Sequence, residues 1–159
     1  MRYANIHTRF WIDQDIKDLG RDARELYLYL MSSPNSNMAG YYYLPMAYML
    51  EHLEAIGHGY GIDTLSIALT TLQTNRKINY DQTAKVVLLR RFLSWNKPEG
   101  EKRILGVLKV VKDVPQSLLL PEFVKCAKEH VPSHTTAWEG LLTGYRYPID
   151  IVSEPYLDP

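Results

Sequence analysis

Residues 35–93 read NSNMAGYYYLPMAYMLEHLEAIGHGYGIDTLSIALTTLQTNRKINYDQTAKVVLLRRFL, and this segment sets the architecture of the chain. Turn-forming residues open it, and the aromatic run from Gly40 to Leu44 is suited to an extended strand. Pro45 ends that strand and starts a helix, because proline fits a first helical turn. One face of this helix carries apolar residues at i, i+3, i+4 and i+7, namely Met46, Met49, Leu50 and Leu53.

A second helix and a hairpin follow within the same segment. Glycines at 57, 59 and 61 break the first helix, and Asp63 is placed to cap the next one. The second helix repeats the four-point apolar face with Leu65, Ala68, Leu69 and Leu72. Residues 77–80, a polar turn at 81–83 and residues 85–89 have the pattern of a β-hairpin. This order predicts a winged helix-turn-helix within a mainly α fold of the α+β class.

Helices are also predicted on both sides of this segment. Before it, Gly20 or Asp22 can start a helix, Asp22 and Glu25 have capping-box spacing, and the core face comprises Ala23, Leu26, Tyr27 and Leu30. After it, breakers at 96–100 precede three helices whose apolar faces lie within 104–111, 120–127 and 135–142. These helices either complete the first core or form a subunit interface. The predicted division is a winged domain with an N-terminal arm at 1–95, a helical extension at 96–143 and an irregular tail at 144–159.

Composition and patterning exclude several classes of protein. A chain of 159 residues with 46% hydrophobic content can bury a core. No apolar run approaches the roughly 18 residues that span a bilayer, and the first residues lack an apolar signal core, so we expect a cytoplasmic protein without a membrane partner. The single cysteine, Cys126, excludes an internal disulfide, and its helical setting predicts a packing role.

The motifs of common enzymes are missing from the sequence. There is no G-x-x-x-x-G-K-[ST], no H-E-x-x-H and no G-x-S-x-G. The best set of metal-ligand types is Glu51, His52, Glu54 and His58, but adjacent Glu51 and His52 point about 100° apart on a helix. We therefore predict a protein that is not an enzyme and that needs neither a cofactor nor a metal.

The charge distribution points to nucleic acid as a partner. The net charge is zero, yet residues 75–103 carry eight basic side chains against three acidic ones. On the hairpin and its flanks, the candidate contacts to a DNA backbone are Arg76, Lys77, Lys85, Arg90 and Arg91. On the second helix, the candidates nearest the bases are Ser66, Thr70 and Gln73. Three further side chains are candidates for stacking on unpaired bases, although strand tyrosines more often lie in a core or an interface: Tyr41, Tyr43 and Tyr80.

Several ordered motifs resemble the N-terminal winged-helix domain of DnaD-like replisome organisers, which include phage replication proteins. The resemblance covers about residues 9–131 and rests on FWID at 10–13, DARELYLYL at 22–30, NSNMAGYYYLP at 35–45, VVLLRRFLSWN at 86–96 and VPQSLL at 114–119. It implies a winged helix with a helical extension that self-associates and helps to assemble replication machinery on DNA, with replication-initiation proteins as possible partners.

Three functional hypotheses follow. The first is a non-enzymatic, DNA-associated protein of replication initiation that binds duplex DNA weakly and forms homo-oligomers. The second is an oligomerisation or protein-interaction scaffold with little DNA affinity of its own, which the neutral net charge and the aromatic strand favour. The third is a winged-helix transcriptional regulator that binds a defined operator.

Overall fold

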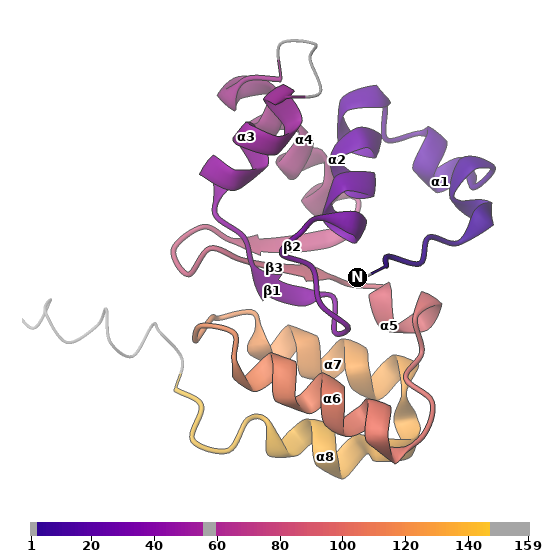
Figure 1. Cartoon of the computed structure of the whole chain (residues 1–159), viewed down its shortest axis with the longest axis vertical. Helices are drawn as coiled ribbons and strands as arrows, with labels where there is room; N and C mark the ends of the chain where they lie inside the picture. Colours follow the sequence, from indigo (N-terminus) through magenta and orange to yellow (C-terminus); the bar gives the residue numbers. More distant parts are fainter. Residues whose placement is uncertain (1–2, 56–59, 147–159) are drawn as a thin grey trace, which may run out of the picture.

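The computed structural model describes residues 3–55 and 60–146, and these residues form a mainly α structure of the α+β class (Figure 1). The elements are, in chain order, η1 (Thr8–Trp11), α1 (Gln14–Lys17), α2 (Arg21–Ser32), β1 (Tyr41–Tyr43), α3 (Met46–Ala55), α4 (Ile62–Thr74), β2 (Ile78–Asp81), β3 (Val86–Leu89), α5 (Phe92–Trp95), α6 (Glu101–Lys112), α7 (Leu120–His130), η2 (Pro132–His134) and α8 (Thr135–Gly140).

A three-stranded antiparallel sheet with the order β1-β3-β2 lies at the centre of the molecule. The hairpin predicted from the sequence pairs β2 with β3, so that Ile78 faces Leu89 and Asp81 faces Val86. The aromatic strand β1 pairs with the other edge of β3, with Tyr42 opposite Val87. The predicted strand and hairpin are therefore confirmed as parts of one sheet.

Helices cover both faces of this sheet, with α2, α3 and α4 on one side and α6, α7 and α8 on the other (Figure 1). Side chains alternate between the two faces, as the period of a strand requires. Tyr42 and Val87 join the core formed with α2–α4, while Tyr41, Val86 and Leu88 join the core formed with α6–α8. The extension thus builds a second core on the back of the sheet.

The predicted apolar faces of the helices are largely buried. On α4, Leu65, Ala68, Leu69 and Leu72 are at most 5% exposed. Ile104, Val107 and Val111 of α6 are buried, as are Phe123, Val124 and Ala127 of α7, which confirms the predicted helical periods. Met46 and Leu50 on α3, Leu108 on α6 and Leu120 on α7 are only partly buried at the edges of these faces.

The predicted cap of α4 is wrong by two residues, whereas α2 begins after Gly20, which is one of its two predicted starts. Gly61 is the N-cap of α4, so Asp63 lies inside the first turn and does not cap the helix. Gly20 is the N-cap of α2, and it has a positive φ of 81° without a capping side chain, so the capping box of Asp22 and Glu25 does not form. Glycine replaces a capping side chain because the chain enters α2 through a conformation that other residues rarely adopt.

The remaining boundaries lie outside regular structure. Residues 96–100 connect α5 to α6 without forming a helix or strand, as the breaker residues predict. Of the predicted irregular tail, residues 144–146 form no regular element, and 147–159 fall outside the described residues. Among residues 3–55 and 60–146, no helix has the length and apolar character required to cross a membrane.

The backbone at Gly40 lies so close to the Phe92 side chain that it leaves no room for a Cβ atom. Its φ is +66°, and a Cβ at this position would lie 2.4 Å from the Cβ of Phe92. Its carbonyl also accepts a hydrogen bond from the Leu89 amide at 2.7 Å, so the backbone cannot shift without loss of a sheet contact.

We expect Gly40→Ala to reduce the free energy of unfolding by about 3 kcal/mol, because it combines left-handed strain with overpacking. Urea unfolding measures the change. Gly140→Ala is the control, since a Cβ there meets no atom within 4 Å; it should shift the free energy by no more than about 0.5 kcal/mol. Equal effects of the two substitutions would contradict the proposed close approach.

Candidate nucleic-acid interface

The outward face of α4 carries the predicted base-contacting residues. Ser66, Thr70 and Gln73 are all exposed. The Thr70 hydroxyl donates to the Ser66 carbonyl at 2.9 Å, and the Gln73 side-chain oxygen accepts from the Tyr80 amide at 3.2 Å. This face also exposes Ile67, and the sequence contains no lysine or arginine between residues 57 and 75. It can offer hydroxyl and amide contacts, but not the arginine–guanine pair that most often specifies sequence.

Arg76 extends from the end of α4 in an unusual backbone conformation. Its amide donates to the Gln73 carbonyl, and the Lys77 amide donates to the Leu72 carbonyl, so the helix ends in a Schellman motif. Glycine is the usual residue at this position, yet here Arg76 has a φ of 55°. An arginine held there adopts a strained conformation that costs about 1 kcal/mol relative to glycine.

Lys85 occupies the equivalent strained position at the turn of the hairpin. Its φ is 58°, its side chain is exposed, and its carbonyl accepts a hydrogen bond from the Leu44 amide at 2.7 Å. With β2 spanning residues 78–81, Lys85 lies roughly 13 Å along the sheet from the end that carries Arg76. The hairpin therefore displays exposed cations at both of its ends.

Lys77 and Arg90 are instead engaged inside the protein. Lys77 is only 8% exposed, and its Nζ lies 3.7 Å from a carboxylate oxygen of Asp15. Arg90 is half-buried, donates to the Asn79 side chain at 2.7 Å and lies 3.2 Å from a carboxylate oxygen of Glu122 on α7. These two of the five predicted backbone contacts already neutralise acidic groups of the same chain.

Arg91 lies at the open end of the hairpin, which is the end where β2 begins and β3 finishes. The Arg90 amide donates to the Lys77 carbonyl at this end, so Arg76 comes directly before one paired residue and Arg91 directly after the other. Arg91 is exposed, and its guanidinium carbon lies 5.9 Å from the centroid of the Trp95 ring. The exposed cations of the predicted set are thus Arg76 and Arg91 at the open end and Lys85 at the turn.

Of the two alternatives for the strand tyrosines, Tyr41 takes the core position and cannot stack on bases. This side chain is 1% exposed and contacts Phe123 with ring centroids 5.3 Å apart. Tyr80 is half-buried, donates its hydroxyl to the Leu44 carbonyl at 2.8 Å, and has its pKa raised to about 12 by burial. Tyr43, at 39% exposed, is the most accessible of the three rings. The aromatic strand serves mainly to build the two cores.

The hairpin turn is held by a buried carboxylate that the sequence reasoning did not identify. Asp81 is 5% exposed; one of its oxygens accepts from the amides of Thr83 and Ala84, and the other accepts from the Ser117 hydroxyl at 2.7 Å. Ser117 is fully buried and also accepts from the Leu119 amide. An aspartate two residues before a threonine is a local turn signal, but its partner in the α6–α7 connection lies 36 residues away.

The predicted metal-ligand types do not converge within the described part of the chain. No group of three or more His, Cys, Asp or Glu residues there has the geometry to hold an ion, and His58 lies outside the described residues. His52 contacts the Tyr29 hydroxyl through Nδ1 at 2.6 Å. Cys126 is buried among apolar residues, and burial raises the pKa of its thiol. Its predicted packing role is confirmed.

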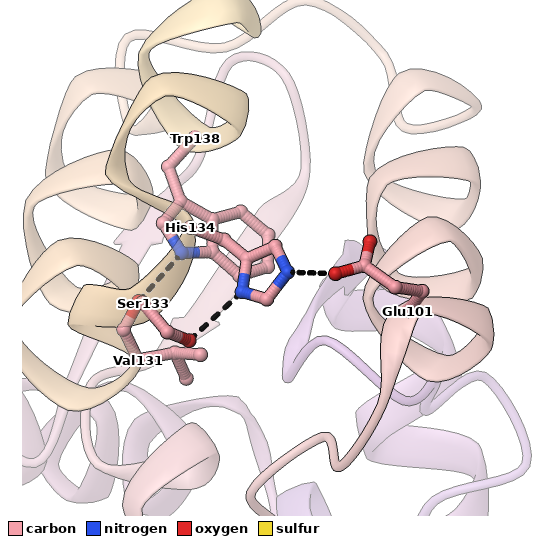
Figure 2. A network of polar contacts seen from close by, with 5 residues as sticks. All are labelled: Glu101, Val131, Ser133, His134 and Trp138. Atoms are coloured by element: carbon pink, nitrogen blue, oxygen red, sulfur yellow. Dashed lines mark hydrogen bonds and ion pairs between the residues drawn. The ribbon is translucent and has the colours of Figure 1, made fainter.

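A serine, a histidine and a glutamate meet where α6 approaches η2. Figure 2 shows the His134 imidazole between the Ser133 hydroxyl, 2.8 Å from Nδ1, and the Glu101 carboxylate, 2.8 Å from Nε2. These are the residue types of a hydrolase triad, but the Glu101 side chain is 80% exposed, whereas an orienting acid is normally buried. The Trp138 indole also donates a hydrogen bond to the Val131 carbonyl. These contacts indicate that the cluster links α6 to η2 and α8.

We expect Ser117→Ala to reduce the free energy of unfolding by about 1–3 kcal/mol, because Asp81 and the Leu119 amide each lose a buried partner. Amide hydrogen exchange should also quicken at Thr83 and Ala84. Ser94→Ala is the control, since that exposed hydroxyl bonds only to the nearby Arg91 carbonyl. Unchanged exchange in the turn of the Ser117 variant would show that Asp81 does not depend on this contact.

Comparisons of the chain with protein-family models, with curated proteins and with solved structures gave no match. The side chains that this interface brings together are therefore the basis for inferring a function.

Proposed function

We propose that residues 1–95 form a winged helix-turn-helix that associates with duplex DNA and acts without enzymatic activity in replication initiation or replisome organisation of the phage type. The helix α4 lies against the groove, and the β2–β3 hairpin forms the wing. The chain works in the cytoplasm as a homo-oligomer together with other replication-initiation proteins. The replication context comes from the resemblance of the motifs to DnaD-like organisers.

The observation that carries this proposal is the placement of α4 and the hairpin. The order α2, β1, α3, α4, β2, β3 and the sheet order β1-β3-β2 are those expected for a winged helix. The polar face of α4 is exposed, and the hairpin that follows it displays Arg76, Arg91 and Lys85 at its two ends. An exposed helix face beside exposed cations suits a duplex, since the cations can contact phosphates while the helix approaches the bases.

The side-chain contacts also divide the five basic residues into two roles. Arg76, Lys85 and Arg91 supply the phosphate contacts, while Lys77 and Arg90 hold the hairpin to Asp15 and Glu122. Three phosphate contacts give modest, salt-dependent affinity, and α4 without basic side chains adds little sequence preference. Duplex binding by this chain alone is therefore expected to be weak.

Removal of two strained cations provides a test that does not damage the fold. In the double variant Arg76→Gly/Lys85→Gly, each glycine accommodates the positive φ, so stability should stay equal or rise by about 0.5–1 kcal/mol per site. Affinity for a short fluorescent duplex should fall, and the slope of log affinity against log salt should become shallower by about 1.8. Fluorescence anisotropy over a salt series measures both quantities.

A matched control removes two cations elsewhere. The exposed lysines Lys17 on α1 and Lys125 on α7 give an equal loss of charge in Lys17→Ala/Lys125→Ala. Duplex affinity that is absent at low salt, or that falls equally in the two double variants, would refute the proposed interface.

One observation favours the scaffold as a second candidate function. Ile62 and Ile67 of α4 are 53% and 68% exposed, and Tyr43 and Tyr48 are also exposed, whereas α4 carries no basic side chain. Large apolar side chains at the surface are typical of a face that contacts another protein. In this function the same helix would contact protein instead of DNA.

The scaffold predicts association through α4. Light scattering should give a mass that rises with protein concentration, and Ile67→Asp should lower that mass at each concentration, because a charge would have to be desolvated at the interface. Leu105→Asp, at an equally exposed position on α6, is the control. The mass of a single chain at every concentration would rule out a self-associating scaffold.

A further inference from the structure

A groove of about 920 Å³ lies where the two layers of helices meet at α5. Four segments line it: the N-terminal residues 3–5, the end of α2 with its connection to β1, α5 with its connection to α6, and one side of α6. No residue of the proposed duplex interface lines this groove. Its volume falls in the range of cavities that hold small ligands or short segments of a polymer.

Aromatic side chains line one part of this groove. Phe92 and Trp95 of α5 are partly buried, and Tyr3 is 83% exposed at the entrance. The Trp95 ring is held in place by an edge contact to Tyr27 at 6.1 Å and by Arg91 over its face. A ring fixed in this way offers a stacking surface at little entropic cost.

Two basic side chains also line the groove. Lys97 and Arg103 are exposed at its rim, with Glu99 as the one acidic side chain lining it. Within the described residues, neither cation forms an ion pair or a hydrogen bond through its side chain. Unlike Lys77 and Arg90, they are not neutralised by a neighbouring carboxylate of the described chain.

Three further lysines of α6 lie on a different face of this helix from Arg103. Lys102, Lys109 and Lys112 recur at i, i+7 and i+10, so they share one face of the helix, and all three are exposed. They cover roughly 15 Å along the helix axis. None of them has an ion-pair partner among residues 3–55 and 60–146. At 100° per residue, these three lysines lie about 100–180° around the helix from Arg103, so they are not part of the groove lining.

We propose that this groove binds single-stranded nucleic acid, with bases against Phe92 and Trp95 and with phosphates on Lys97 and Arg103. Aromatic rings beside cations are the two elements of a non-specific single-strand site. A duplex keeps its bases stacked inside, so the rings of a groove gain nothing from it. The site uses none of the proposed duplex contacts and goes beyond that function.

Binding of a fluorescent oligothymidylate, followed by anisotropy over a salt series, tests the cations. Lys97→Ala/Arg103→Ala should lower the affinity about tenfold and make the salt slope shallower by about 1.4, as expected for two lost contacts to a single strand. Lys17→Ala/Lys125→Ala, which removes equal charge from α1 and α7, should change neither quantity. Thermal unfolding should show that both double variants remain folded, because all four positions are exposed.

Tryptophan fluorescence tests the stacking separately. In a Trp11→Phe background the remaining tryptophans are Trp95, which lines the groove, and Trp138, which is 0% exposed. Oligothymidylate should quench Trp95, whereas an abasic phosphodiester of the same length should bind more weakly and leave the fluorescence unchanged. The abasic chain keeps the phosphates and removes only the bases.

Several outcomes would overturn the proposal: equal affinity losses in both double variants, no quenching by oligothymidylate, or equal binding of the abasic chain. Quenching by polyglutamate as strong as that by oligothymidylate would also overturn it, in favour of an acidic protein partner. The two interfaces can fail independently, since Arg76→Gly/Lys85→Gly should weaken duplex binding alone and Lys97→Ala/Arg103→Ala single-strand binding alone. Arg91 is left intact in both tests because it contacts the Trp95 ring.

Discussion

Burial of both faces of β3 is the constraint on which the rest of the structure depends. Val87 and Leu89 lie in the core with α2–α4, and Val86 and Leu88 lie in the core with α6–α8. Each fully buried aliphatic side chain contributes about 1.5–3 kcal/mol. Because neighbouring side chains point to opposite faces, a register shift of one residue would exchange the contents of the two cores. One short strand thus determines where the hairpin, and every cation on it, is held.

Polar contacts at the sheet fix the hairpin further, and they determine which cations remain exposed. Asp81 joins the turn to Ser117, while Arg90 joins Asn79 on β2 to Glu122 on α7. These bonds hold the hairpin against the extension, but the second one uses a basic side chain that a DNA backbone would otherwise attract. The contact that fixes the hairpin in place therefore also neutralises one of its positive charges.

Local patterns in the sequence predicted the helices, the hairpin and their apolar faces, because amphipathic periods depend on neighbouring residues alone. Contacts between distant residues were not predictable in this way. The burial of Lys77 depends on Asp15, 62 positions earlier in the numbering, and the groove combines segments near residues 3, 34, 97 and 103. The pattern missed the cap at Gly61 because Asp63 has the more typical capping side chain. The sequence also could not place Tyr41 in a core, because that depends on helices from distant segments covering both faces of the sheet.

A chain of zero net charge attracts a polyanion only over short distances, since its long-range field is small and salt screens it within about 10 Å. Local geometry must then provide any affinity, and Arg91 lies where the two basic surfaces approach each other. Its guanidinium belongs to the open end of the hairpin, yet it covers one face of Trp95, which lines the groove. An Arg91 that turned fully to a phosphate would give up this cation–π contact, which is worth about 0.5–1 kcal/mol at an exposed site. The fixed position of the Trp95 ring and a phosphate contact by Arg91 therefore oppose each other, but only by that modest energy.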